Sequence, residues 1–158
     1  MTLEKLDSTS PRKRGGRASP THSPPPATSR ILLVDDHAPT REEMAALLAG
    51  RTGLQVVAQA ASGEDAIRQA RLLKPDLVVM DIFLPGISGV EATAAITRDL
   101  PGVRVVALTN HCGSSVVRAF MRAGGIGYVR KSSAFEELLP AIEAALAGQS
   151  YMGPEVSD

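Results

Sequence analysis

Short apolar runs alternate with amphipathic stretches from residue 30 onward, and this alternation limits the possible folds more than any other feature of the sequence. Five such pairs can be counted along the chain. Apolar runs of this kind are typical of buried strands, and apolar side chains three or four positions apart are typical of helices. Because strands that alternate with helices favour a parallel sheet covered on both faces, we expect an α/β fold with a doubly wound, five-stranded parallel sheet.

The five expected strands are short and have an apolar middle: 31–34, 54–60, 76–81, 103–108 and 126–129. The third run has no polar residue between Asp76 and Asp81, which predicts a central strand buried on both faces. Each strand is followed by an expected helix: one opened by a capping box of Thr40 and Glu43, one capped by Ser62, one over 89–99, one from Ser114, and one capped by Ser133 and Glu136.

The last of these helices carries two specific expectations. Its spacing predicts a buried stripe of Phe135, Leu138, Leu139, Ile142 and Leu146. Pro140 also falls inside it, where a proline removes a backbone donor at a cost of about 3 kcal/mol. The pattern therefore predicts either a kinked helix or a misplaced boundary.

Length and composition favour one domain with a tail at each end. With 158 residues, of which 44% are hydrophobic, the chain can bury one sizeable core. Residues 1–29 are rich in Pro, Ser and Arg and have almost no large apolar side chains, so we expect a disordered tail there. The domain is expected over 30–148, followed by a second tail over 149–158.

Composition also argues against several kinds of protein. Cys112 is the only cysteine, so neither an internal disulfide nor a cysteine-based zinc site can form within the chain. No apolar run approaches the roughly 18 residues that span a bilayer and no secretory leader opens the chain, so we expect a cytoplasmic protein without a membrane segment. Beyond the tail at 1–29, 15 acidic side chains outnumber 12 basic ones, so nucleic acid is not an expected partner.

Polar residues stand at the ends of four of the five expected strands. Asp35 and Asp36 follow the first strand, Asp81 ends the third, Thr109 follows the fourth, and Lys131 comes soon after the fifth. The carboxyl ends of parallel strands share one edge, where ligands bind in such folds, so these side chains should meet. Clustered carboxylates repel one another unless a cation lies among them, and magnesium (Mg2+) prefers oxygen ligands. The sequence therefore predicts a Mg2+ site at this edge.

A carboxylate in such a site can act as a nucleophile toward phosphorus. We expect Asp81 in this role, with Lys131 as a second positive charge and Thr109 as a hydrogen-bond donor to a phosphoryl oxygen. Each residue also has an ordinary interpretation when it is taken alone. Asp81 beside Pro85 suits a turn, Lys131 suits the surface, and Tyr128 suits a strand in the core. Only the whole set favours a site.

The set resembles the receiver domain of bacterial two-component response regulators. The resemblance covers about residues 30–150 and rests on Asp35-Asp36, 80–89, 107–109 and 127–131, in matching order and spacing. It implies a flavodoxin-like (βα)5 fold with strand order 2-1-3-4-5. It further implies a phosphorylation-dependent signalling switch that accepts a phosphoryl group from a sensor histidine kinase.

The resemblance also assigns roles to residues. It implies that Asp81 is the phosphoacceptor and that Mg2+ is held by Asp36, Asp81 and the backbone carbonyl of Phe83, with Asp35 helping through water. It implies that Tyr128 is a switch aromatic, whose ring turns inward when Thr109 moves. Such a protein is not an enzyme acting on an external substrate, although it assists its own phosphoryl transfer and dephosphorylation.

Local details resemble the LuxR-type subgroup, often called NarL/FixJ: the run Thr109-Asn110-His111 and the ending over 148–156. In that subgroup a DNA-binding helix-turn-helix usually follows, and residues 149–158 resemble the start of an interdomain linker. Because this chain stops at Asp158, we expect no direct DNA binding from it. The expected partners are the kinase and a downstream protein target or output domain. The resemblance also allows a phosphorylation-dependent homodimer.

Three alternatives stay open at the level of the sequence. The chain can be the regulatory part of a LuxR-type DNA-binding transcriptional regulator, or a degenerate receiver that serves only as a protein-binding scaffold. A phosphatase of the haloacid dehalogenase type is disfavoured, because it needs Asp-x-Asp after the first strand and this chain has adjacent Asp35-Asp36.

Overall fold

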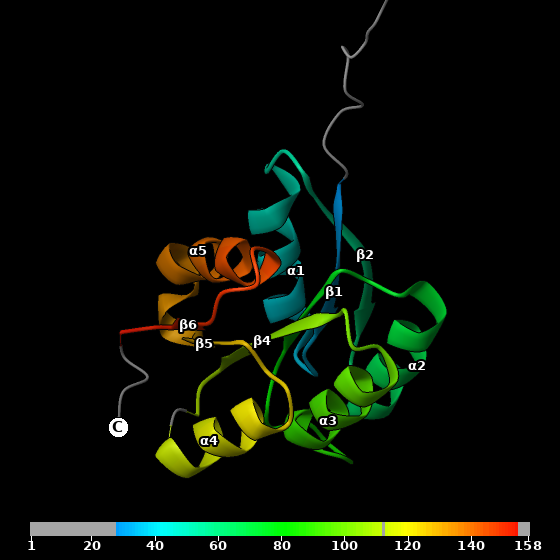
Figure 1. Cartoon of the computed structure of the whole chain (residues 1–158). Coiled ribbons are helices and arrows are strands. Elements are labelled where there is room, and N and C mark those ends of the chain that lie inside the picture. The colour runs from blue at the N-terminus through cyan, green and yellow to red at the C-terminus, as the bar shows by residue number, and fades with distance from the viewer. Residues whose placement is uncertain (1–27, 112, 155–158) are drawn as a thin grey trace, which may run out of the picture.

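The computed structural model describes residues 28–111 and 113–154, which form a parallel sheet with helices on both faces (Figure 1). The expected disordered tail, except for its last two residues, and Cys112 lie outside the described residues. The strands are β1 (Ser29–Val34), β2 (Leu54–Ala60), β3 (Leu77–Met80), β4 (Arg104–Thr109), β5 (Gly127–Arg130) and β6 (Tyr151–Met152). The helices are α1 (Ala38–Ala49), α2 (Gly63–Leu73), α3 (Gly89–Asp99), α4 (Ser114–Arg122), the 3-10 turn η2 (Lys131–Ser133) and α5 (Ala134–Leu146).

The strand order is β2-β1-β3-β4-β5-β6, which confirms the predicted order 2-1-3-4-5 and adds one strand. All neighbours are parallel. Val34, the last residue of β1, pairs with Ala60 on one side and Met80 on the other. The winding therefore reverses between β1 and β3, and ligands bind in such sheets beside the carboxyl ends of these strands.

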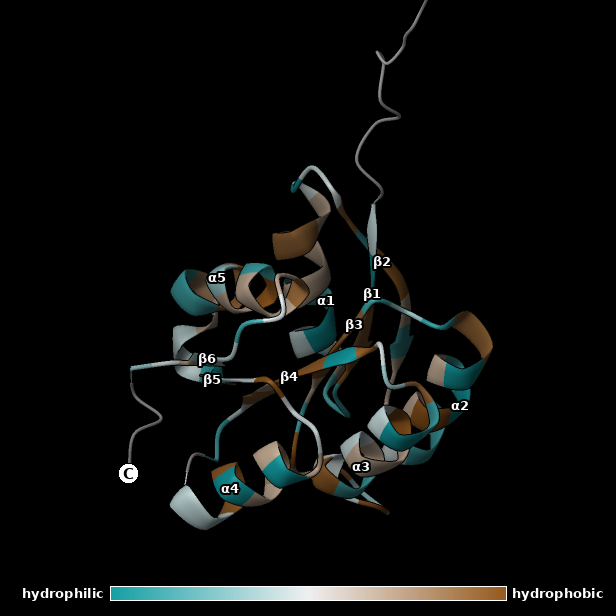
Figure 2. Cartoon of the chain, in the orientation of Figure 1, coloured by the Kyte–Doolittle hydropathy of each residue, from teal (hydrophilic) through white to brown (hydrophobic). Residues whose placement is uncertain are grey.

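The sheet separates two apolar layers. Along β1, Leu32 and Val34 face one layer, while Ile31 and Leu33 face the other, as the alternation of side chains in a strand requires. Helices α2, α3 and α4 cover the first layer, and α1 and α5 cover the second (Figure 1). Figure 2 shows brown and teal residues on different sides of α2 and α4, as expected for helices with one buried face. Within the described residues, every helix is too short or too polar to cross a membrane.

The start of α1 differs from the prediction. The helix begins at Ala38 after His37, and no side-chain capping bond is made, so the predicted capping box of Thr40 and Glu43 is wrong. Pro39 accounts for the earlier start, because its fixed φ suits the first turn of a helix. The hydroxyl of Thr40 is hydrogen-bonded to the ring of His37 at 2.8 Å instead. By contrast, Ser62 caps α2 as predicted, accepting a bond from the N–H of Asp65.

Helix α5 departs from the prediction at its amino-terminal end. Ser133 precedes the helix, but its side chain makes no capping hydrogen bond. Phe135 was expected in the buried stripe, yet 79% of it is exposed, whereas Leu138 and Ile142 are buried. The helix runs through Pro140 to Leu146. Because Pro140 is on the exposed side, water can hydrate the carbonyl that loses its donor.

Candidate functional site

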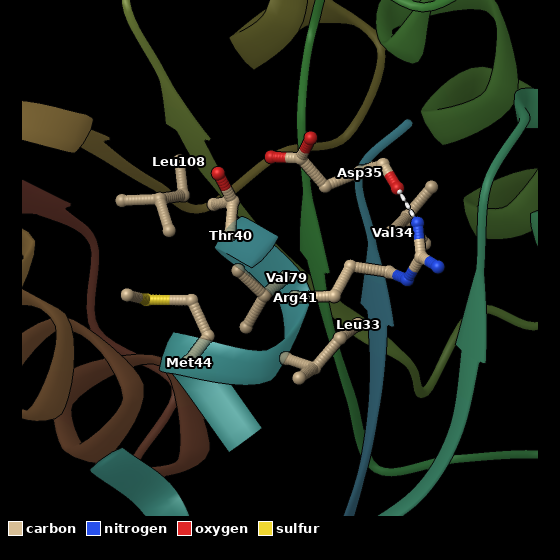
Figure 3. A pocket seen from close by; sticks show the side chains of 8 residues that line it. All are labelled: Leu33, Val34, Asp35, Thr40, Arg41, Met44, Val79 and Leu108. Carbon is tan, nitrogen blue, oxygen red and sulfur yellow. Dashed lines mark hydrogen bonds between the residues drawn. The ribbon is translucent and has the colours of Figure 1, made fainter. Parts of the chain in front are cut away.

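The end of β1 presents two carboxylates in different surroundings. Asp35 is buried, whereas Asp36 is exposed. The backbone N–H of His37 donates to the Asp35 carboxylate at 2.9 Å, and the guanidinium of Arg41 donates to the Asp35 backbone carbonyl. Figure 3 shows the carboxylate pointing away from Arg41. The guanidinium therefore fixes the backbone at this strand end without occupying the carboxylate.

Asp81 follows β3 directly, and the loop after it is held tightly against α3. The N–H of Gly89 donates to the carbonyl of Ile82 at 2.7 Å. A Cβ atom at position 89 would lie 2.1 Å from the carbonyl oxygen of Asp81, so only glycine fits there. A capping box formed by Ser88 and Glu91 then starts the helix. These contacts hold the backbone of Asp81 in place.

Lys131, which begins η2 directly after β5, joins the two buried carboxylates. Its Nζ lies 2.7 Å from Oδ2 of Asp35 and 3.0 Å from Oδ2 of Asp81. Only 18% of the lysine side chain and 7% of each aspartate side chain are exposed. In such shielded surroundings the attraction is stronger than at the surface, but each charge also loses hydration.

Asp36 completes a cluster that suits a divalent cation. One carboxylate oxygen from each of Asp35, Asp36 and Asp81 can be chosen so that all lie within 4.8 Å of one another. Carboxylate oxygens are the ligands that Mg2+ prefers, with waters and phosphate oxygens completing its shell. Three carboxylates beside the single ammonium group of Lys131 also leave an excess of negative charge. The residues therefore fit the ion that the sequence predicts.

The surroundings shift the pKa of both Asp81 and Lys131. Burial raises the pKa of Asp81 above its ordinary value of 3.8, and the charge of Asp35 adds to this, although hydrogen bonds from Lys131 and Thr109 oppose it. Burial by itself lowers the pKa of Lys131, but its bonds to Asp35 and Asp81 outweigh this and raise it above 10.5. The lysine is therefore charged at neutral pH, yet it does not fully offset the burial of Asp81.

Thr109 and Tyr128 are completely buried. The hydroxyl of Thr109, at the end of β4, accepts a hydrogen bond from the N–H of His111 at 3.3 Å. The hydroxyl of Tyr128 donates to the carbonyl of His111, and its ring packs edge-on against Phe120. The predicted switch aromatic thus has its ring inside the domain. Phe83 is half-exposed, and its ring lies against the ring of His111.

Comparison with known proteins identifies the family. Residues 31–143 match the family model of the response regulator receiver domain. The chain belongs to this receiver family. Receivers act in phosphorylation-dependent signalling and bind Mg2+ at an acidic pocket, and the cluster of Asp35, Asp36 and Asp81 has the composition of such a pocket.

Individual relatives place this receiver near the LuxR-type subgroup. The response regulator GacA of Pseudomonas viridiflava is 42% identical over 128 residues, which are 81% of this chain and 60% of GacA. A LuxR-family response regulator from Aurantimonas sp. SI85-9A1 is 45% identical, with a TM-score of 0.79 over 82% of this chain and 93% of the other. The receiver domain of NarL from Mycobacterium tuberculosis is 27% identical, with a TM-score of 0.74 over 78% of this chain and 100% of the other. The chain thus spans about 60% of the length of GacA.

The structure brings together most of the residues predicted for the site. Asp35, Asp36, Asp81 and Lys131 meet at the carboxyl edge of the sheet, and Thr109 is close enough to Asp81 to lower its pKa. The individual roles of these residues, and that of the Phe83 carbonyl as a ligand, stay predictions. Sequence reasoning missed the contact of Arg41 with Asp35, and its only signal was a long basic side chain one turn into the first helix.

Proposed function

We propose that this receiver accepts a phosphoryl group from a sensor histidine kinase on Asp81, in a reaction that depends on Mg2+. The observation that carries the proposal is the position of Lys131, whose Nζ contacts carboxylate oxygens of both Asp35 and Asp81. An ammonium group held beside a buried carboxylate can stabilise the oxygens of a phosphoryl group attached to that carboxylate.

The proposed Mg2+ site is formed by Asp35, Asp36, Asp81 and the backbone carbonyl of Phe83, with Asp35 acting through water. When bound, the ion would offset the negative charge of the phosphoryl oxygens. In the proposed transfer an oxygen of Asp81 forms a bond to phosphorus, and the bond from phosphorus to the donor histidine nitrogen breaks, leaving its electron pair on that nitrogen. Lys131 donates to the transferred group as it arrives.

Thr109 and Tyr128 have the proposed role of converting this modification into a signal. The Thr109 hydroxyl can donate to a phosphoryl oxygen on Asp81, which adds an attraction that the unmodified carboxylate lacks. A shift of Thr109 alters the surroundings of Tyr128, because both contact His111. We propose that a downstream target or output domain recognises the altered surface, with a phosphorylation-dependent homodimer as one form of this recognition.

The proposal extends to the organisation and location of the protein. We propose a cytoplasmic signalling protein that turns over no external substrate. Its receiver unit is proposed over 30–148, between a tail at 1–29 and a C-terminal segment at 149–158. Strand β6 falls in that last segment and pairs with β5, so the first part of the segment packs on the domain.

The decisive experiment is incubation of the whole chain with acetyl phosphate, with and without Mg2+, followed by intact mass measurement. We expect the gain of one phosphoryl group only when Mg2+ is present, and no gain in Asp81→Asn. The matched control is Asp76→Asn, which removes a carboxylate at the opposite end of β3 and should leave the gain unchanged. If the parent chain gains no mass, the domain is a degenerate receiver that serves as a scaffold.

A second candidate is the regulatory part of a LuxR-type transcriptional regulator. Its support is the length comparison, because this chain spans about 60% of GacA. The test is whether the reading frame of the intact gene continues past Asp158 into a helix-turn-helix. This candidate keeps the same chemistry at Asp81 and differs only in the output.

A further inference from the structure

Glu64, in the first turn of α2, contacts the loop that joins β3 to α3. Its Oε2 atom accepts a hydrogen bond from the backbone N–H of Ile87 at 3.2 Å. The same oxygen lies 2.6 Å from the position that a Cβ atom would take on Gly86, so the carboxylate fills the space beside this glycine. The loop also contains Phe83, whose backbone carbonyl belongs to the proposed Mg2+ site. The proposed function assigns no role to Glu64.

Helix α2 touches the same loop a second time through Gly63, which is buried. A Cβ atom at position 63 would lie 2.7 Å from Cγ1 of Ile87, and Ile87 is itself packed against the apolar layer beneath α2, α3 and α4. The start of the helix is held by Ser62, whose side chain accepts from the N–H of Asp65 at 3.1 Å. The carboxylate of Glu64 is therefore attached to a fixed helix start that already packs closely on the loop.

The residues just before Glu64 are bound to the other half of the site. The carbonyl of Ala60, the last residue of β2, accepts from the backbone N–H of Asp35 at 3.1 Å. Only three residues separate Ala60 from Glu64. The segment 60–64 is therefore hydrogen-bonded at one end to the backbone of Asp35 and at the other end to the loop that follows Asp81. It connects the two parts of the chain that form the proposed Mg2+ site.

We propose that Glu64 is a positioning residue for the Mg2+ site, which holds the loop after Asp81 so that the carbonyl of Phe83 keeps its place among the ligands. The inference rests on the proposed function, since it takes that carbonyl as a ligand. Mg2+ requires near-octahedral geometry with short bonds, so a small shift of one ligand weakens its binding. A carboxylate suits this positioning role, because a charged acceptor makes a stronger hydrogen bond to a backbone N–H than a neutral one.

The test is the affinity for Mg2+ alone, measured by calorimetry on the whole chain and on its Glu64→Ala and Glu64→Gln variants. We expect about a fivefold loss of affinity in Glu64→Ala, which is less than the roughly 10- to 100-fold loss typical when the direct partner of a metal ligand is replaced. Glutamine keeps an oxygen that can accept from Ile87, so Glu64→Gln should recover most of the affinity. Unchanged affinity in Glu64→Ala, or an equal loss in both variants, would overturn the proposal.

The matched control is Asp65→Ala. Asp65 follows Glu64 in the same first turn of α2, but its carboxylate pairs with Arg68 on the helix itself. Both alanine variants remove one acidic side chain from the start of α2, so they should lose similar stability in the absence of Mg2+. Only Glu64→Ala should also lose affinity for the ion. An equal loss of Mg2+ affinity in Asp65→Ala would assign the effect to net charge and contradict the positioning role.

Hydrogen exchange of the Ile87 amide, followed by NMR without Mg2+, measures the contact itself. A hydrogen-bonded amide exchanges more slowly than a free one, so exchange should be faster in Glu64→Ala than in the parent chain or Glu64→Gln. Equal exchange in all three would contradict the contact.

The outcomes also separate this inference from the proposed function. If the parent chain does not bind Mg2+, the proposed metal site fails, and the positioning role fails with it. If the parent chain and Glu64→Ala bind Mg2+ equally well, only the positioning role of Glu64 fails.

Discussion

At the amino-terminal ends of the strands, charged side chains hydrogen-bond to neighbouring backbone, whereas at the carboxyl ends the buried carboxylates of Asp35 and Asp81 share the ammonium group of Lys131. Arg30 donates to the carbonyls of Leu73 and Lys74, and the N–H of Arg30 donates to Asp76. Arg104 donates to the carbonyl of Ala145 at the end of α5. At the other edge, the only ammonium group among the described contacts of Asp35 and Asp81 is that of Lys131.

The difference separates an edge of the sheet whose charges serve stability alone from an edge whose charges also serve chemistry. Hydrogen bonds from charged side chains to backbone carbonyls satisfy loop groups that would otherwise depend on water. The buried carboxylate of Asp81 instead loses hydration, and this loss raises its pKa. Changes at the amino-terminal ends should therefore affect stability alone, whereas changes at the carboxyl ends should affect both stability and phosphorylation.

The largest effect on stability is expected from Lys131→Met. This change leaves the buried carboxylates of Asp35 and Asp81 without their cation, which should lower the free energy of unfolding by about 3 kcal/mol. Denaturant unfolding at neutral pH without divalent cations measures it. The control is Arg98→Met, whose exposed ion pair with Asp99 should matter far less. Equal losses in the two variants would show that the carboxyl-end cluster is not held by its lysine.

Mg2+ should have the next largest effect on stability, because it would bind the folded chain and not the unfolded chain. At a concentration 100 times its dissociation constant, a ligand of the folded state adds about 2.7 kcal/mol. We expect a higher unfolding temperature with Mg2+, its reversal by a chelator, and a smaller rise in Asp36→Asn. Asp36 is exposed, so its replacement should change the metal-free stability little. An equal rise in unfolding temperature in the parent chain and in Asp36→Asn would exclude Asp36 as a ligand.

Asp81→Asn should stabilise the metal-free fold at neutral pH, because burial disfavours the charged carboxylate. Burial raises the pKa of Asp81, so the folded chain holds this proton more tightly than the unfolded chain does. The resulting stabilisation is complete below pH 3.8 and is lost as the pH rises through the folded-state pKa. The advantage of asparagine should therefore grow with pH over that interval. Unfolding temperatures from pH 3 to 8 measure it, and an advantage that shrinks with rising pH would contradict the sign.

The smallest effect on stability is expected at the amino-terminal ends of the strands. Arg104→Met removes the bond from Nε to the carbonyl of Ala145 and should lower the free energy of unfolding by about 1 kcal/mol. Phosphorylation by acetyl phosphate should proceed as in the parent chain. A loss of phosphorylation without a loss of stability would remove the distinction between the two ends.

The site could be predicted largely because strand ends can be read from the sequence. Asp35, Asp81 and Thr109 each stand where an apolar run stops, and parallel strands bring those points to one edge. The contacts of His111 could not be predicted, because they depend on the path of a loop. Arg41 was missed for a different reason, because its partner is a backbone carbonyl, which has no signal in the sequence.

The order of the strands and helices could be predicted, but the residues at which they begin and end could not. Strand β6 has two residues, which is too short for any periodicity to appear. The predicted capping box at Thr40 had the right residue types and spacing, but Pro39 favoured an earlier start. Phe135 has the spacing of the buried stripe, yet it lies in the first turn of α5, where it is exposed. Spacing identifies a helical face, but the docking of that helix decides how far along it the burial extends.

Strand β6 also joins the C-terminal segment to the middle of the domain. Met152 pairs with Tyr128, and the N–H of Gly153 donates to the Tyr128 carbonyl at 3.0 Å. The backbone of the buried aromatic is thus hydrogen-bonded directly to one of the last residues that the structure describes. A rotation of β5 would therefore move Gly153 with it, because backbone hydrogen bonds join these segments.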